Sequence, residues 1–209
     1  MPAFDPGVWF AICFNELLFK IFKNEVSYWF SKGYLLLSVM EAEEAIICFN
    51  NAIAKRPDYV EALWRRGVAK GMKKDLGGAL ADFTRAIEIN PECGMAYSNR
   101  SKVYRMLGMI KESLSDASKA LEIYPKNTNT LNSRGCTLIE VGDYQGAIAD
   151  FTRAIKIDKK YGDAYYNRGN VFDKLNDYES ARKDWEKADS LGSEDTSRWD
   201  RVYYWNRYY

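Results

Sequence analysis

The side chain that most often serves as a general base in catalysis is missing from this chain. There is no histidine among its 209 residues, which removes the commonest general base and the usual nucleophile–histidine pairs. No phosphate-binding glycine loop, G-x-S-x-G elbow or dinucleotide-binding glycine pattern occurs. The acidic residues are spaced as on the solvated faces of helices. We therefore predict that the protein is not an enzyme and needs no cofactor.

The four cysteines are not placed to bind a metal. Cys13, Cys48, Cys93 and Cys136 form no C-x-x-C motif, and there is no histidine to complete a zinc site. We interpret them as buried free thiols. Together with an apolar N-terminal stretch that no basic residue precedes, they predict a cytoplasmic protein.

The overall charge gives no preference for one class of ligand. Thirty Lys and Arg residues against 29 Asp and Glu residues leave a net charge of +1, so no global field attracts nucleic acid, anionic lipid or an acidic substrate. With 47% hydrophobic residues the chain can bury a substantial core. Any charge-driven binding must therefore be local.

A period of 34 residues organises the chain. The segment at 81–87, ADFTRAI, returns unchanged at 149–155, two periods later. Columns of small, aromatic and proline residues recur at the same step. They are Gly33, Gly67, Ser101, Gly135 and Gly169; Ala45, Ala79, Ser113, Ala147 and Ala181; Phe49, Phe83, Ala117, Phe151 and Trp185; Ala52, Ala86, Ala120, Ala154 and Ala188; and Pro57, Pro91 and Pro125.

Each period has the composition of a helix hairpin. Small residues let two helices approach closely, large residues fill the seam beside them, and proline ends the second helix. The pattern predicts five repeats. They cover residues 26–59, 60–93, 94–127, 128–161 and 162–192.

These columns resemble the tetratricopeptide repeat (TPR), in which a large residue, glycine, alanine, an aromatic residue, alanine and proline follow at fixed spacing. Trp29, Gly33, Ala45, Phe49 and Ala52 match it in the first repeat. The resemblance implies an all-α fold, a right-handed superhelical solenoid of helix-turn-helix repeats. Because a solenoid exposes an apolar face at each end, we expect capping helices within residues 1–25 and 193–209.

In this family the first helix of each pair lines a concave groove that binds a peptide or protein segment, and the resemblance implies the same here. The groove residues follow from the register. They are Phe30, Tyr34, Leu37, Trp64, Val68, Met72, Lys102, Arg105, Asn132, Tyr166 and Asn170. The apolar members come from the first two repeats and the polar members from the later ones. We therefore predict an amphipathic partner segment held by aromatic anchors, although Phe30 and Trp64 could instead contact the N-terminal helix.

One TPR subclass grips the terminal carboxylate of heat-shock chaperones. Its members place Lys and Asn on one helix, Asn on the next, and Lys and Arg on the third. No window of three repeats in this chain supplies that set. We therefore predict that the partner is not the tail of such a chaperone.

The two ends of the chain are further candidate binding elements. Asp5 and Pro6 can start a helix whose apolar stripe, with Trp9 beside it, would pack on the first repeat or lie in the groove. A docking face for a partner or a membrane surface is the alternative for this helix. At 8–22 the apolar stretch contains polar residues and is shorter than the about 20 apolar residues of a spanning helix.

The C-terminal tail combines aromatic and arginine side chains. Trp199, Tyr204 and Trp205 suit a capping helix or a partner anchor, and these are the contacts we predict there. Interleaving with Arg198 and Arg201 leaves an RNA-associated factor as the weaker alternative. Taken together, the sequence predicts a cytoplasmic protein-binding scaffold or adaptor that serves as a subunit or assembly factor of a larger complex.

Overall fold

A computed structural model of the chain describes residues 25–192. These residues form ten α-helices and no strand, so the predicted all-α class is confirmed. The helices are α2 (Val26–Ser38), α3 (Ala42–Lys55), α4 (Val60–Met72), α5 (Leu76–Ile89), α6 (Gly94–Met106), α7 (Ile110–Ile123), α8 (Thr128–Glu140), α9 (Tyr144–Ile157), α10 (Gly162–Lys174) and α11 (Tyr178–Ser190). The predicted capping helices, at 1–25 and 193–209, fall outside the described range apart from Glu25.

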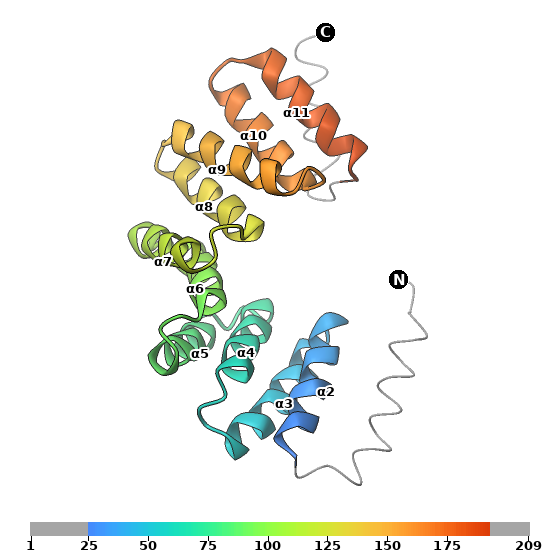
Figure 1. Cartoon of the computed structure of the whole chain (residues 1–209), viewed down its shortest axis with the longest axis vertical. Helices are drawn as coiled ribbons and strands as arrows, with labels where there is room; N and C mark the ends of the chain where they lie inside the picture. The colour runs from blue at the N-terminus through green and yellow to red at the C-terminus, as the bar shows by residue number, and fades with distance from the viewer. Residues whose placement is uncertain (1–24, 193–209) are drawn as a thin grey trace. The chain divides into compact units, whose positions relative to one another are not determined.

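The helices pack in sequence order (Figure 1). Within the first compact part of the chain, Met1–Val103, α2 packs on α3, α3 on α4 and α4 on α5. Within the second part, Tyr104–Tyr209, α7 packs on α8, and α8, α9, α10 and α11 follow in the same way. The division between the parts falls inside α6. Within each part, the helices therefore bury their apolar sides against neighbours that are close in the sequence.

The turn inside each hairpin uses a left-handed residue. The positive-φ residues Met40, Lys74, Gly108, Gly142 and Asn176 recur at the repeat spacing. After each of them an amide donates to a carbonyl near the end of the first helix, as from Asp143 to Leu138 at 3.0 Å. The side chain of Asp143 then caps α9 by accepting a hydrogen bond from the Gly146 amide at 2.9 Å. This combination ends one helix and starts the next within three residues.

The core of every described hairpin except the third is an aromatic ring placed against a glycine. Phe49, Phe83 and Phe151 are at most 1% exposed. A Cβ atom added at Gly67 would lie 2.7 Å from Cε1 of Phe83, and one at Gly135 would lie 2.6 Å from Cε1 of Phe151. The ring occupies the volume that any larger residue on the first helix would need. The glycine and aromatic columns of the sequence are therefore one packing unit.

Candidate protein-binding surface

Arginines on the first helices of the repeats recur at one position. Each of them connects its helix to the second helix of the same repeat and to the second helix of the preceding repeat. Arg66, Arg134 and Arg168 each donate Nε and Nη2 to both carboxylate oxygens of an aspartate 16 residues later. Each also donates Nη1 to a polar side chain 16 residues earlier, on the second helix of the preceding repeat. Such planar two-point pairs fix the register between helices.

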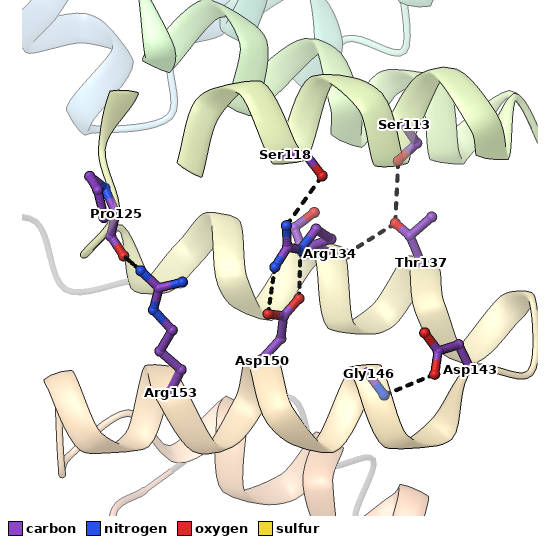
Figure 2. Close-up of polar contacts among 10 residues, drawn as sticks. Ser113, Ser118, Pro125, Arg134, Thr137, Asp143, Gly146, Asp150 and Arg153 are labelled. Atoms are coloured by element: carbon purple, nitrogen blue, oxygen red, sulfur yellow. Dashed lines mark hydrogen bonds and ion pairs between the residues drawn. The ribbon is translucent and has the colours of Figure 1, made fainter. Parts of the chain in front are cut away.

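Figure 2 shows this arrangement around Arg134. Arg134 projects from α8, with Asp150 on α9 and Ser118 on α7, at distances of 2.7–2.8 Å and 3.2 Å. Hydrogen bonding to Asp150 raises the pKa of the Arg134 guanidinium, and burial opposes this. Arg153 on α9 reaches back to the carbonyl of Pro125 at 2.7 Å. Arg66, Arg134, Arg153 and Arg168 thus use their guanidinium groups within the fold.

The sequence analysis missed this column, although the signal was present. Asp82 and Asp150 lie inside the repeated ADFTRAI segment, and the arginines recur at the same period of 34 residues. The first repeat departs from the pattern, with Lys32 and Cys48 at the corresponding positions. Burial raises the pKa of the Cys48 thiol to about 11, and Lys32 opposes the shift. The packing role of these positions could have been found by comparing charged columns as well as apolar ones.

Four aromatic side chains gather around one arginine in the first compact part. We call Phe30, Tyr34, Tyr59, Trp64 and Arg65 the aromatic cluster. The guanidinium carbon of Arg65 lies 4.3 Å from the ring centroid of Trp64, 4.5 Å from that of Tyr34 and 5.9 Å from that of Phe30. The centroids of Phe30 and Tyr59 are 4.9 Å apart. The structure therefore brings together three of the predicted groove residues, from α2 and α4.

The aromatic cluster packs on the buried core through Phe30 and Trp64 and is exposed to solvent at Tyr34. The Phe30 ring centroid lies 6.1 Å from that of the fully buried Phe49, and Trp64 packs on the core that contains Phe83. Tyr34 is 47% exposed. The cluster thus combines rigid support with accessible aromatic surface, which is typical of protein-binding anchors.

The other predicted groove residues of this part differ in how deeply they are buried. Leu37 packs on the core below α2 and α3, and Val68 packs on the core that contains Phe83. Met72, at the end of α4, is 40% exposed. Lys102 on α6 is half-buried.

The predicted groove residues of the second part are engaged in polar pairs. Arg105 forms an ion pair with Glu140 at 3.0 Å, and Asn132 accepts a hydrogen bond from Asn167 at 3.0 Å. Asn170 accepts one from the indole of Trp185 at 3.0 Å, so its amide is directed to the second helix of its own repeat.

Two tyrosines complete the polar side of this part. Tyr166 is half-buried on α10. The Tyr161 hydroxyl donates to Asn129 at 2.9 Å, and burial raises its pKa to about 12. The second part therefore presents amides and a phenol already bonded to one another, in contrast to the aromatic cluster.

The remaining predictions concern the aromatic residues near the two ends of the chain, metal binding, the cysteines and membrane-spanning helices. Trp9, Trp199, Tyr204 and Trp205 are outside the described residues. Between residues 25 and 192 no group of acidic or cysteine side chains could hold a metal ion. The three cysteines of that range are free thiols. None of the ten described helices is both long and apolar enough to cross a bilayer.

Comparison with known proteins explains the repeated geometry. Models of the tetratricopeptide repeat match residues 117–149, 135–176 and 162–192. Human tetratricopeptide repeat protein 13 is 31% identical over 85 residues. The chain belongs to the tetratricopeptide-repeat family. The human match covers 38% of this TPR chain and 10% of the human protein, so it concerns repeats and not the whole relative.

Solved TPR structures share the fold. The crystal structure of YrrB, a TPR protein with an unusual peptide-binding site, has a TM-score of 0.63 and 22% identity, over 87% of this chain and 93% of YrrB. Cut9, in the APC/C hetero-tetramer Cut9–Hcn1, has a TM-score of 0.79 and 19% identity, over 88% of this chain and 36% of that chain. A TPR protein from Parabacteroides merdae reaches 0.74 at 20% identity, over 91% and 74% of the two chains. These likenesses establish the TPR solenoid fold.

Proposed function

We propose that this TPR protein holds a segment of a partner protein against the first helices of its repeats, and that the aromatic cluster is the main anchor. The observation that carries the proposal is the exposure of Tyr34 beside Trp64 and Phe30, on helices whose other side is packed into the core. Large aromatic side chains held rigidly lose little conformational entropy on binding, so they supply much of the affinity of an interface.

The proposed partner segment is amphipathic. Its apolar side would pack on the aromatic cluster and Met72. A scaffold of this kind serves as a subunit or assembly factor of a larger complex in the cytoplasm. The absence of the chaperone-tail set of Lys and Asn residues supports a partner other than a chaperone tail.

The test is a selection of random 12-residue peptides displayed on phage, with the full chain as bait. We expect wild-type protein to enrich peptides that carry aromatic or leucine residues. Tyr34→Ala should reduce this enrichment, because it removes exposed binding surface from a residue that the core does not need. Trp64→Ala should reduce it further, with helical content near normal by far-UV circular dichroism.

The matched control is Ile47→Ala, which removes an apolar side chain that is 59% exposed on α3, a second helix of its pair. This variant should select the same peptides as wild type. Enrichment that survives both Tyr34→Ala and Trp64→Ala, or that Ile47→Ala also abolishes, would place binding elsewhere and refute the proposal.

A further inference from the structure

We propose that Arg65 is the contact for an acidic side chain of the partner segment, next to an apolar side chain that packs on Tyr34 and Trp64. This inference rests on the proposed function and adds to it the chemistry of the partner. The segment would therefore carry Asp or Glu close to an aromatic or leucine residue. Arg65 differs from the other arginines of the repeats in its contacts.

Arg65 has no acidic partner in the described part of the chain. Its neighbour in sequence, Arg66, is bonded to both oxygens of Asp82 at 2.6 and 2.8 Å. Arg65 makes neither a hydrogen bond nor an ion pair with any residue from 25 to 192, and its Nε atom is buried without an acceptor. Glu61, one turn earlier on α4, is exposed and forms no ion pair with it in that range. A buried donor without an acceptor is costly and uncommon in folded proteins.

The surroundings of Arg65 hold its guanidinium in place while leaving its donors unused. Contacts with the faces of Trp64, at 4.3 Å, and Tyr34, at 4.5 Å, restrict the side chain and remove water from its flat faces. Burial lowers the pKa of Arg65, and Tyr34, Glu61 and Tyr59 oppose this shift. The group remains a cation at neutral pH, because arginine side chains are not deprotonated in proteins. A partly desolvated cation of this kind favours an anion of the partner.

A carboxylate fits this position better than other polar groups. The guanidinium presents its donors in a planar fork that matches the two oxygens of a carboxylate. Arg56, whose guanidinium carbon lies 3.5 Å from the ring centroid of Tyr59, adds a second cation at the edge of the cluster. The aromatic rings supply the apolar surface for the neighbouring residue of the segment.

The experiment uses the full chain and the best peptide from the phage selection, made with its acidic residue and with the corresponding amide. Displayed peptides have no free C-terminal carboxylate at the junction, so enrichment of Asp or Glu reports side-chain recognition. Affinities are measured by fluorescence anisotropy for wild type, Arg65→Gln and Arg85→Gln. Arg85, on α5, is an exposed cation paired with Glu88, so its replacement changes the net charge equally without touching the cluster.

We expect the change from Glu to Gln in the peptide to weaken binding to wild type by roughly tenfold or more, as for a charge-assisted hydrogen bond. For the Arg65→Gln variant, the same peptide change should lower the affinity by less than about twofold. For the Arg85→Gln variant, it should lower the affinity as much as it does for wild type. A destabilised fold would weaken both peptides equally, so the difference between them isolates the pairing of Arg65 with the carboxylate.

Other results would overturn the inference. The role of Arg65 would be refuted if the selected peptides showed no preference for acidic residues. It would also be refuted if the change from Glu to Gln in the peptide lowered the affinity equally for Arg65→Gln and wild type. Either result would leave the proposed function standing. Failure of wild type to enrich any peptide would refute both the proposed function and the role of Arg65. This holds if a second copy occupies the cluster, and equally if the chain's own residues 1–24 occupy it. Sedimentation would identify the second copy as occupant if wild type self-associates and Arg65→Gln does not.

Discussion

The glycine and aromatic columns predict opposite effects for the same substitution at two positions on one helix. Gly67 and Gly71 both lie on α4, one turn apart. A Cβ atom at Gly67 would meet three atoms of the Phe83 ring at 2.7–3.0 Å, whereas one at Gly71 would meet no atom within 4 Å. Gly67→Ala should therefore be destabilising, and Gly71→Ala should be stabilising.

The magnitudes follow from two opposing effects. Alanine gains roughly 0.5–1 kcal/mol over glycine at an interior helix position, through backbone entropy. That gain is unopposed at Gly71. At Gly67 the ring of Phe83 is 1% exposed and cannot move away freely, so overpacking costs about 1–3 kcal/mol. Because the entropic gain is the same at both positions, the two variants should differ in unfolding free energy by the overpacking cost alone, about 1–3 kcal/mol.

The assay is urea unfolding followed by far-UV circular dichroism, with native-state hydrogen exchange to locate the effect. Because repeat arrays can unfold in more than one step, protection of amides in α4 and α5 is compared directly between variants. Equal or greater stability of Gly67→Ala relative to Gly71→Ala would refute the assignment of this glycine to close packing.

The third repeat suggests a compensated version of the same test. It has Ser101 in the glycine column and Ala117 in the aromatic column. The double variant Gly67→Ser with Phe83→Ala copies that pair into the second repeat. We expect it to be at least about 1 kcal/mol more stable than the sum of the single effects, because the serine fills part of the space left by the ring. Simple additivity would show that the two positions are not coupled.

Three further predictions concern the polar contacts and the thiols. Asp150→Asn should lower the unfolding free energy by roughly 2–4 kcal/mol, because it leaves the arginine on α8 without its buried partner. Arg182→Gln, in an exposed ion pair, should lower it by under about 1 kcal/mol. Urea unfolding measures both effects. Asp143→Ala should cost about 1 kcal/mol through loss of the α9 cap, measured in the same way. The thiol of Cys48, whose pKa is raised to about 11, should be alkylated more slowly at pH 8 than the partly exposed Cys136. The stability that Cys48 contributes should be complete below about pH 8.5 and lost as the pH rises toward 11. Peptide mapping by mass spectrometry measures the alkylation, and equal rates at the two cysteines would contradict the buried position of Cys48.

The sequence by itself determined the repeating fold. Small residues such as Ala52 and Ala86 recur because two helix backbones can approach only where side chains are short, and this requirement is visible at a constant spacing. The same spacing identified Phe30, Tyr34 and Trp64 as neighbours on first helices, and the structure brings their rings around one guanidinium. Periodicity reports which residues must pack, because packing repeats with the helix pair.

The charged columns at the repeat spacing indicate which arginines can serve packing, but only the tertiary structure decided which arginine lacks an acceptor among the described residues. Arg65 and Arg66 are adjacent and identical in the sequence, yet one is bonded to Asp82 across the hairpin and the other faces aromatic rings without an acceptor in the described chain. That difference depends on the direction in which each side chain leaves α4 and on what the neighbouring helices place there. Asn170 shows the same limit, since its register suggested the groove while its amide bonds Trp185. Distances between helices distinguish a structural cation from a binding one, and no local pattern of residues contains those distances.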